Sequence, residues 1–343
     1  MIFRSSESLD PSGSGSKRTL AIEDEMIWLV GAGQMAQSYS AVLKELGRAH
    51  TAIGRSAQSA QAFTQKTGIE CRLGGLKSAL AEMPPPSTAI VAVNVDQLAQ
   101  TALDLLGAGC THVLLEKPGG VDAAEIERVA QQAEACGANV RVAYNRRFYA
   151  SVLAAQNLVA EDGGVTSMTF EFTEVSDVVV KLPYPPHVLA NWLLANSTHV
   201  IDTAFYLAGD PQQIFPLTAG SLNWHPRAAR FAGAGVTQLG ALFSYHADWD
   251  APGRWGIEAN TLKRRLILRP MEQLQVQHRG QFSVAPHGEE DELDRRFKPG
   301  LYRQVKAFLE GTDEERLLSI ADHARRASTI YATLFDSLLK PQA

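Results

Sequence analysis

The stretch Met26-Ile-Trp-Leu-Val-Gly-Ala-Gly-Gln-Met-Ala36 decides the fold of this chain. Its first five residues form an apolar run of the length of a buried strand, and a helical pattern then extends to about Gly47. A strand, a glycine-rich turn and a helix in this order form the first unit of a parallel sheet that binds a dinucleotide. We therefore expect an α/β fold that begins at Met26.

The GxGxxA loop in this stretch has a physical requirement at each small residue. Gly31 lets the chain turn tightly, Gly33 lets the backbone approach a pyrophosphate, and Ala36 lets the helix pack close to the strand. The N-terminus of the helix then faces the phosphates. Gln34 and Met35 open this helix and are predicted, with the two glycines, to contact the cofactor. A tight turn without a ligand is the alternative interpretation.

Apolar runs of strand length alternate with helical patterns as far as residue 145. The later runs cover residues 49–53, 88–93, 112–115 and 139–143. Asp122 and Glu125 have the spacing of an N-terminal cap for a helix that ends near Cys136. This alternation predicts a doubly wound parallel sheet, a Rossmann domain, over residues 26–145.

The end of the second strand predicts which cofactor is used. An Asp or Glu about 20 residues after the glycine loop would accept a hydrogen bond from the ribose 2'-hydroxyl of NAD. The chain has Gly54-Arg55-Ser56 instead. Arg55 and Ser56 offer hydrogen-bond donors to a 2'-phosphate, and no carboxylate repels it. NADP is therefore expected, with NAD also possible; the alternative is that Arg55 is a solvated loop residue and the enzyme does not distinguish the two cofactors.

Polar residues follow two later strands of the predicted sheet. Asn94 ends the strand at residues 88–93, and Glu116-Lys117-Pro118 ends the strand at 112–115. Ligands of open α/β sheets bind at the carboxyl ends of the strands. A lysine at this edge can meet both the nicotinamide side of the cofactor and a substrate hydroxyl, although a surface lysine in an ordinary loop is the alternative.

The pattern changes after residue 145. A helix is expected over residues 148–159, followed by several strands without helices between them, and helices over 302–310 and 313–339 close the chain. Consecutive strands of this kind indicate an α+β domain with an open, predominantly antiparallel sheet. We expect this second domain, residues 146–343, to bind the substrate and to carry the oligomer contacts.

The first half resembles the Gfo/Idh/MocA family of NAD(P)-dependent sugar and cyclitol oxidoreductases. The resemblance rests on residues 26–36, 91–94, 109–119 and 142–148. It implies that Lys117 holds the substrate hydroxyl and assists proton movement, and that Pro118 follows a cis peptide bond. It also implies that Glu116, Asn145 and Arg146 lie near the cofactor, although the last two could equally be structural caps.

The resemblance extends to a helix over residues 191–202. The family pattern there places an aspartate four residues before a histidine, so that the carboxylate can orient and charge the imidazole. His199 fits the catalytic position, but the aspartate position is Ala195. Asn196 or Asp202 could orient the ring instead. A structural histidine is the alternative interpretation of His199.

A proline-rich insertion, Lys181-Leu-Pro-Tyr-Pro-Pro-His187, precedes this helix. A stiff loop here would border the substrate pocket, which makes Tyr184 and His187 candidate substrate contacts, although a rigid connector is an equally good interpretation. Asn196, in the following helix, is a further candidate substrate contact. No HxxxH motif or paired-carboxylate cluster supports a metal site.

Composition excludes several classes of partner. The chain has 343 residues and a net charge of -5, which disfavours nucleic acid because phosphate binding needs a basic face. No apolar run approaches the roughly 20 residues needed to span a bilayer. Residues 1–25 are rich in Ser, Gly and Pro, lack the apolar stretch of a signal peptide, and are expected to be disordered. Three scattered cysteines fit a reducing cytoplasm.

These observations lead to one expected function and two alternatives. We expect a cytoplasmic NADP(H)-dependent oxidoreductase that moves a hydride between the nicotinamide and a hydroxyl or keto carbon of a sugar, sugar derivative or cyclitol. The resemblance further implies a homodimer or homotetramer formed through the C-terminal sheet. The alternatives are a non-catalytic dinucleotide-binding regulator, and a reductase of an imine or linear tetrapyrrole.

Overall fold

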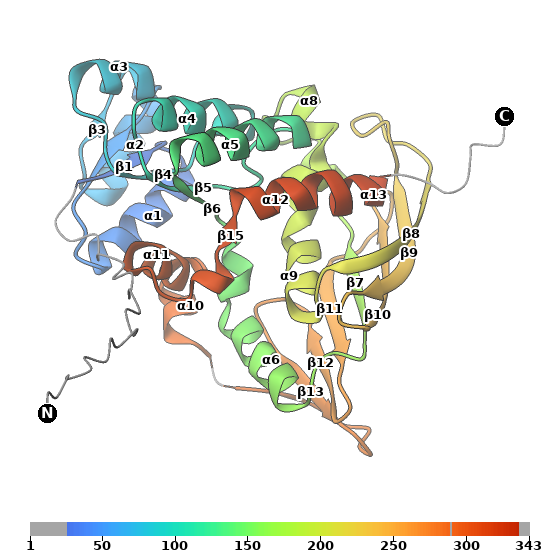
Figure 1. Ribbon diagram of the computed structural model, residues 1–343. Helices are drawn as coiled ribbons and strands as arrows, with labels where there is room; N and C mark the ends of the chain where they lie inside the picture. Colours follow the sequence, from blue (N-terminus) through green and yellow to red (C-terminus); the bar gives the residue numbers. More distant parts are fainter. Residues whose placement is uncertain (1–25, 289, 336–343) are drawn as a thin grey trace, which may run out of the picture.

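The structure is a computed structural model that describes residues 26–288 and 290–335. The expected disorder of residues 1–25 therefore lies outside the described residues. The described chain forms two sheets with separate helical layers, and several late helices pack beside the first sheet (Figure 1).

The first sheet has seven strands in the order β15-β6-β5-β4-β1-β2-β3. The strands are β1 (Ile27–Val30), β2 (His50–Ile53), β3 (Cys71–Arg72), β4 (Thr88–Val91), β5 (His112–Leu115), β6 (Asn139–Val142) and β15 (Leu318–Ser319). β1 to β6 pair in parallel, whereas β15 pairs with β6 in antiparallel orientation. The predicted doubly wound parallel sheet is confirmed.

Helices cover both faces of this sheet because its buried strands are apolar on both sides. The helices are α1 (Gln34–Glu45), α2 (Ala57–Thr67), α3 (Gly75–Glu82), α4 (Val95–Gly107) and α5 (Ala123–Cys136). In β1, Ile27 and Leu29 join the core under α1, whereas Trp28 and Val30 join the core under α4 and α5. Asp122 caps α5 as predicted, since its side chain accepts from the Glu125 N–H.

The second sheet has eight strands in the order β14-β13-β12-β11-β7-β10-β9-β8. They are β7 (Ser167–Phe172), β8 (Pro211–Ala219), β9 (Arg230–Thr237), β10 (Leu242–Asp248), β11 (Trp255–Asn260), β12 (Arg264–Leu268), β13 (Gln275–His278) and β14 (Val284–Pro286). Only the β7–β10 pair is parallel. The prediction of an open, predominantly antiparallel sheet is confirmed.

Helices α6 (Ala150–Glu161) and α9 (Thr198–Ala208) pack on the second sheet. Short helical segments join the larger elements: η1 (Asn145–Phe148), α7 (Ser176–Val179), α8 (Pro186–Leu189), η2 (Leu193–Ser197), α10 (Glu292–Arg296), η3 (Glu314–Arg316), η4 (Ala327–Tyr331) and α13 (Ala332–Phe335). η2 and η4 are single π-helical turns, a geometry that is rare and often found at functional sites.

The chain returns to the first sheet after it leaves the second. Helix α11 (Leu301–Glu310) packs on α1, and α12 (Ile320–Arg326) packs on α5. The predicted single helix over residues 313–339 is wrong in its described part, because β15 interrupts it by pairing with β6. α12 begins only at Ile320, where Ser319 provides the cap by accepting from the Asp322 N–H. Residues 336–339 lie outside the described residues.

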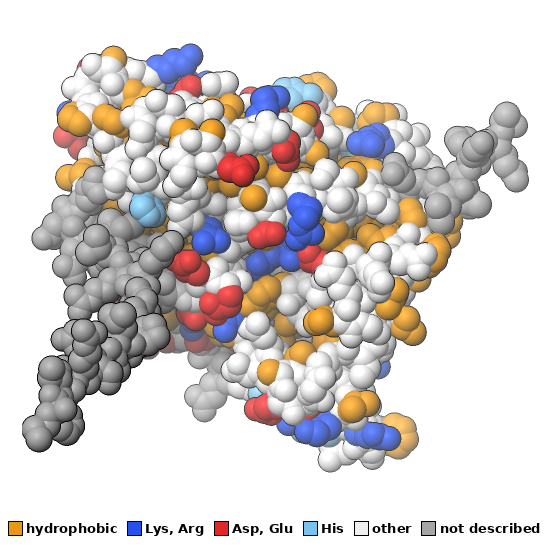
Figure 2. Space-filling model, in the orientation of Figure 1, with side chains coloured by type: hydrophobic (Ala, Val, Ile, Leu, Met, Phe, Trp, Pro, Cys, Tyr) orange, Lys and Arg blue, Asp and Glu red, His pale blue; other side chains and the backbone are white. Residues whose placement is uncertain are grey.

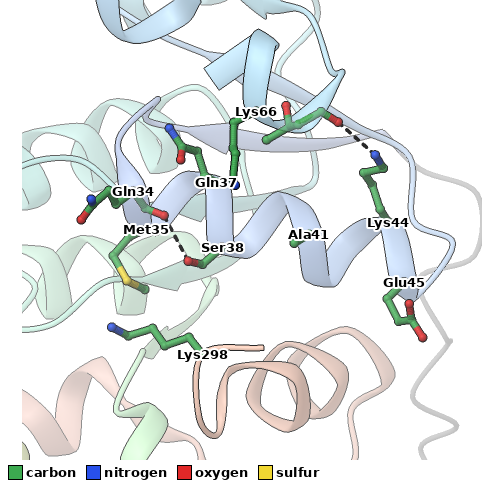
Figure 3. A pocket seen from close by; sticks show the side chains of 10 residues that line it. Gln34, Met35, Gln37, Ser38, Ala41, Lys44, Glu45, Lys66 and Lys298 are labelled. Carbon is green, nitrogen blue, oxygen red and sulfur yellow. Dashed lines mark hydrogen bonds between the residues drawn. The ribbon is translucent and has the colours of Figure 1, made fainter. Parts of the chain in front are cut away.

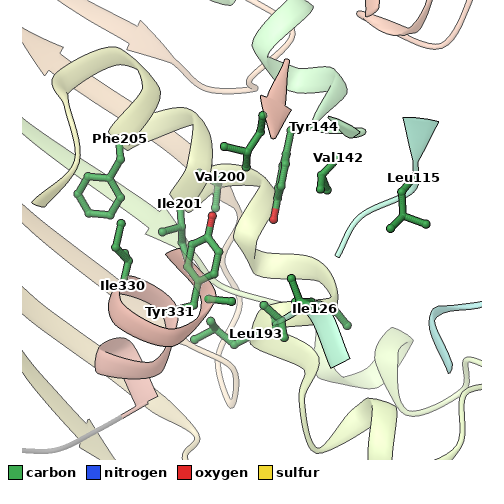
Figure 4. Packing of buried hydrophobic residues seen from close by; sticks show 14 of the residues in the cluster. Leu115, Ile126, Val142, Tyr144, Leu193, Val200, Ile201, Phe205, Ile330 and Tyr331 are labelled. Carbon is green, nitrogen blue, oxygen red and sulfur yellow. The ribbon is translucent and has the colours of Figure 1, made fainter. Parts of the chain in front are cut away.

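The interface between the two sheets is a continuous apolar core. Figure 4 shows Val142 and Tyr144, at the end of β6, beside Val200 and Ile201 of α9 and Tyr331 of η4. A buried ion pair reinforces this junction: Arg147 Nε and Nη2 donate to both Asp202 carboxylate oxygens at 2.7 and 2.6 Å. Arg326 Nη1 donates to the same carboxylate at 2.8 Å. These contacts therefore fix the position of helix α9 relative to the end of β6.

No helix in residues 26–288 or 290–335 is long and apolar enough to cross a membrane.

Candidate active site

The two glycines of the GxGxxA loop have different environments. Gly31 has φ +129°, and a Cβ added to it would lie 2.2 Å from the Ala92 carbonyl oxygen of the neighbouring strand end. Only glycine fits there, as the tight turn predicted. A Cβ on Gly33 would have no protein atom within 4 Å. The protein itself thus leaves open space over Gly33, which is what the approach of a pyrophosphate requires.

The N-terminus of α1 is suited to bind phosphate. Its first turn contains no acidic residue, and no side chain caps it from Gly33. The N–H groups at the start of a helix lack intrahelical partners and carry partial positive charge. The loop and the helix end together fit the diphosphate of a dinucleotide.

A cavity of about 420 Å³ joins the loop to the other strand ends. Ten of the predicted residues line it: Gly31, Gly33, Gln34, Met35, Arg55, Ser56, Asn94, Glu116, Lys117 and Tyr184. They come from β1, β2, β4 and β5, whose carboxyl ends meet at one edge of the sheet, and from the proline-rich insertion. The sequence therefore identified residues that the fold brings into one cavity.

Arg55 and Ser56 lie at the part of this cavity formed by the end of β2. With the Gln97 amide oxygen turned toward it, the Arg55 guanidinium donates to Gln97 from Nη1 at 2.9 Å and Nη2 at 3.1 Å. Ser56 is the N-cap of α2 and accepts from the Ser59 N–H, which leaves its hydroxyl proton free to donate. An exposed guanidinium beside a helix N-terminus is a favourable setting for a phosphate.

Glu116 is held by a hydrogen bond from another element. Tyr39 of α1 donates its hydroxyl to Glu116 Oε1 at 2.7 Å. Burial raises the pKa of Glu116, whereas the Tyr39 hydrogen bond and the charge of Lys117 oppose that rise. Sequence reasoning missed Tyr39, which lies on the buried face of an amphipathic helix, where an aromatic residue normally belongs to the core.

Lys117 reaches across the junction between the two sheets. Its Nζ donates to the main-chain carbonyl of Ala195, in the π-helical turn η2, at 2.7 Å. Burial lowers the pKa of Lys117 to about 8, with nearby Arg146 and Lys298 adding to the effect and Glu116 and Glu174 opposing it. A lysine side chain with such a pKa can lose a proton as the ammonium and gain one as the neutral amine near neutral pH.

His199 lies on the first turn of α9 and is buried, at 7% exposure. Its ring packs at 5.8 Å from the Tyr144 ring and 6.1 Å from the Trp255 ring, between centroids. Burial, with the charges of Arg146 and Lys117, lowers its pKa well below the usual value. Nδ1 has no hydrogen-bond partner among the described residues. The imidazole is therefore neutral at pH 7 and is oriented by packing.

The two residues considered for orienting this ring are engaged elsewhere. Asp202 is paired with Arg147 and Arg326. Asn196 donates its amide to both oxygens of Glu174, at 3.0 and 3.2 Å. The Asp–His arrangement of the family pattern is thus not rebuilt around His199 by either residue.

Glu174 is the carboxylate that sequence reasoning missed. It follows β7, is 5% exposed, and accepts from Ser197 Oγ at 2.6 Å as well as from Asn196. Burial raises its pKa, opposed by these hydrogen bonds and by the charge of Lys117. The available signal was its place shortly after a strand of alternating polarity. The fold thus supplies a buried carboxylate near Lys117 from a different element than the one bearing Ala195.

The Arg146 guanidinium lies over two aromatic rings. Its guanidinium carbon lies 4.8 Å from the centroid of the Trp255 ring and 5.7 Å from that of Tyr149. Trp255 begins β11, so the second sheet places this ring between Arg146 and His199. No local spacing relates Trp255 to Arg146 or His199, because these contacts join two domains.

Three other predicted residues lie outside the cofactor cavity. Asn145 is buried and donates its amide to the Pro299 carbonyl at 2.9 Å. The Lys117–Pro118 peptide bond is cis, and the Pro118 carbonyl accepts from His323 Nε2 at 2.8 Å. His187 lies exposed on α8. None of these three lines the cavity with Lys117, and their proposed roles at the ligand stay predictions.

A larger hollow of about 930 Å³ continues from the glycine loop along α1 (Figure 3). It shares Gln34 and Met35 with the cofactor cavity and is lined on its other sides by Lys44, Lys66 and Lys298. Lys44 is engaged, since its Nζ donates to the Thr67 carbonyl at 2.9 Å. Lys298 points back toward Met35 and so brings a positive charge to the mouth of the site.

The part of the chain that the structure describes has no group of three or more His, Cys, Asp or Glu side chains arranged to hold a metal ion.

Comparison with known proteins identifies the first domain. Residues 26–144 match the model of an oxidoreductase family with an NAD-binding Rossmann fold. The matched model is that of the Gfo/Idh/MocA family, and it covers about a third of this chain. The match covers the glycine loop, Arg55 and the Glu-Lys-Pro turn, which contribute residues to the cavity described above.

Curated relatives match over a similar length. The trans-1,2-dihydrobenzene-1,2-diol dehydrogenase of Sus scrofa is 30% identical over 138 residues, which is 39% of this chain and 41% of the relative. The enzyme of the same name from Mus musculus is 29% identical over 137 residues, 39% of this chain and 40% of the relative. The alignments thus span about two fifths of these proteins.

Solved structures match nearly the whole described chain, at low identity. An oxidoreductase from Agrobacterium radiobacter in complex with NAD+, L-tartaric acid and magnesium has a TM-score of 0.72 and 15% identity, covering 90% of this chain and 94% of that one. Levoglucosan dehydrogenase in complex with NADH and L-sorbose has a TM-score of 0.70 and 17% identity, covering 91% and 96%. The UDP-N-acetylglucosamine 3-dehydrogenase of Acidithiobacillus ferrooxidans has a TM-score of 0.69 and 13% identity, covering 90% and 96%. These likenesses show that both domains share the fold of these solved structures.

Proposed function

We propose that this protein is an NADP(H)-dependent oxidoreductase that interconverts a hydroxyl and a keto group on a small polyhydroxylated substrate. The observation that carries the proposal is Lys117, whose pKa is lowered to about 8 and which lines the cofactor cavity beside the family's glycine loop. The named relatives act on sugars, a sugar nucleotide and a dihydrodiol, which are all hydroxyl-bearing compounds.

The cofactor fits the residues present. The loop at Gly31 and Gly33 and the N-terminus of α1 would hold the diphosphate, and Arg55 with Ser56 would hold a ribose 2'-phosphate. The absence of a carboxylate at the end of β2 favours NADP over NAD. When bound, the nicotinamide supplies or accepts the hydride.

Lys117 is the proposed proton donor and acceptor. For oxidation, the neutral amine accepts the hydroxyl proton as the hydride leaves the carbon; for reduction, the ammonium donates that proton to the forming alkoxide. Because its pKa is about 8, both forms are populated near neutral pH. His199 is neutral in this site and provides a hydrogen bond to the substrate without carrying charge.

Glu174 has the role of balancing charge near Lys117. The carboxylate is fixed by Ser197 and Asn196, and its attraction keeps the pKa of Lys117 from falling further. Without a buried negative charge, desolvation and the neighbouring cations would favour the neutral amine still more strongly. We therefore propose Glu174 as a positioning residue that acts through Lys117.

A non-catalytic dinucleotide-binding regulator is the second candidate, because Ala195 removes the carboxylate of the family pattern. Glu174 weakens that candidate, since the site still holds a buried carboxylate near Lys117.

The decisive experiment measures turnover. Purified protein is incubated with NADP+ or NADPH and a panel of polyols, sugars, sugar acids and their keto forms, while absorbance at the reduced nicotinamide band is followed. Turnover that Lys117→Met lowers by at least about 100-fold, with NADPH binding unchanged, supports the oxidoreductase. NADPH binding without turnover on any member of the panel favours the regulator, and equal turnover in Lys117→Met rejects the assigned role of this lysine.

A further inference from the structure

Arg146 forms no ion pair in the part of the chain that the structure describes. Its guanidinium lies over Trp255 and Tyr149, and no hydrogen bond or ion pair joins it to another of the described residues. The next residue, Arg147, has the opposite arrangement, with two donors on Asp202. A guanidinium carries five N–H donors in a planar fork, and those of Arg146 donate to no other of the described residues.

Arg146 is partly buried, and burial lowers the pKa of its guanidinium. None of its nitrogens is among the buried polar atoms that lack a partner, a group that includes Nε of Arg141 and Nε of Arg326. The free donors of Arg146 are therefore not completely enclosed by the described residues.

Arg146 lies near Lys117 and His199, the two residues proposed to act on the substrate hydroxyl. Trp255 contacts Arg146 on one side and the His199 ring on another, at 4.8 and 6.1 Å between the respective centres. The charge of Arg146 acts on Lys117 and on His199, lowering the pKa of both. The free guanidinium thus lies in the same site as the two groups that would handle the substrate hydroxyl.

The carboxylates near Arg146 attract its charge from a distance, and two of them are held by other groups. Glu116 is bound by Tyr39, and Glu174 is bound by Ser197 and Asn196. Neither forms an ion pair with Arg146. Lys298 adds a further positive charge that also acts on Lys117 and His199. A ligand bearing a negative charge would be attracted by these cations.

We propose that the substrate is a hydroxy or keto acid of the sugar-acid class, with its carboxylate bound in a bidentate manner by Arg146 above the Trp255 ring and its reacting hydroxyl at Lys117. This inference rests on the proposed oxidoreductase function and names its substrate class. A carboxylate matches the planar fork of one guanidinium with two parallel hydrogen bonds. In oxidation, the C–H hydride passes to the nicotinamide, the hydroxyl proton passes to Lys117, and a carbonyl forms, so two electrons leave the substrate carbon.

The test compares acids with neutral partners on the NADP+-loaded protein by isothermal titration calorimetry. The ligands are D-glucuronate and its methyl ester, D-gluconate and its amide, and glucose 6-phosphate. At least one acid is expected to bind 10-fold or more tightly than its neutral partner. Arg146→Gln should remove that difference while the Kd for NADPH changes less than twofold. Arg254→Gln is the matched control, because Arg254 is an exposed arginine at the start of the same strand and should leave the preference intact.

Three results would overturn the proposal. One is that no acid binds more tightly than its neutral partner; another is that Arg146→Gln keeps the preference or loses NADPH binding to the same extent. Tighter binding of glucose 6-phosphate than of both acids would assign the site to a phosphate ester instead. NADPH binding by the wild-type protein is measured first, and its failure would reject the proposed function and the substrate class together.

Discussion

Lys117 Nζ donates to the main-chain carbonyl of Ala195 at 2.7 Å, across 78 positions of sequence. The residue at the position where the family pattern has an aspartate therefore contacts the lysine through its backbone. The contact is made in the π-helical turn η2, directly before α9. The carboxylates that raise the pKa of Lys117 are Glu116 and, from a residue that follows β7, Glu174. This arrangement gives the first two predictions.

The pH dependence of turnover should follow Lys117. Because burial holds its pKa at about 8, oxidation, which needs the neutral amine, should rise as pH increases through about 8 and then level off. Reduction needs the ammonium and should fall over the same range. The measurement is kcat against pH in each direction. A profile for Lys117→Ala that keeps this inflection, even at a lower rate, would assign the titrating group elsewhere.

Glu174→Gln should move that profile to lower pH. Removing the carboxylate takes away a charge that stabilises the ammonium, so the inflection assigned to Lys117 should shift toward acid while the Kd for NADPH stays unchanged. Glu174→Asp keeps the charge and should restore the position of the inflection in part. If both variants lower the rate but leave the inflection at the wild-type pH, Glu174 has only a structural role.

Arg55→Ala should weaken NADPH binding much more than NADH binding. The substitution would remove up to two charge-assisted hydrogen bonds to the 2'-phosphate, at about 1.5 to 3 kcal/mol each. The affinity for NADPH is therefore expected to fall by at least 10-fold. Fluorescence titration with both cofactors measures it. Arg72→Ala, an exposed arginine on β3 that does not line the cofactor cavity, is the control. Equal losses for both cofactors would contradict the preference for NADP.

His323 should make folding stability depend on pH. Burial lowers its pKa to about 4, so the unfolded chain binds a proton near pH 6.5 that the folded protein excludes. The stabilising effect is complete above pH 6.5 and is lost as pH falls toward 4, by up to about 3 kcal/mol. Urea unfolding at pH 7 and 4.5 should show a smaller loss for His323→Gln than for the wild type. His199 titrates in both proteins, so the difference between them isolates His323.

We propose that a second copy of this chain covers the outer face of the second sheet. Phe215, Leu217 and Leu242 are exposed by 42 to 63%, and the strand register places them on one face of β8 and β10. Figure 2 shows hydrophobic side chains gathered over β8 and β9. Such a patch on an open sheet is typical of an interface between subunits.

Phe215→Glu combined with Leu242→Glu should convert a dimer or tetramer to a monomer, measured by light scattering during size-exclusion chromatography. Phe282→Glu is the control, because Phe282 is 99% exposed on a separate hairpin. A monomeric wild-type protein would reject this interface.

The sequence by itself determined the first domain and its cofactor cavity. The glycine loop, Arg55, Asn94 and Lys117 follow successive strands, and in a parallel sheet the carboxyl ends of successive strands meet at one edge. Local spacing was therefore enough to predict that these residues share a site.

The tertiary structure decided which groups from the second domain complete that site. Glu174 lies near Lys117, and Trp255 contacts both Arg146 and His199, only because α9 and the second sheet are fixed against β6 by the Arg147–Asp202 pair and a shared core. These contacts join positions far apart in the chain, where no periodicity or spacing relates one residue to another. The strand β15 could not be predicted for the same reason: it has two residues, and only its pairing with β6, far away in the sequence, makes it a strand.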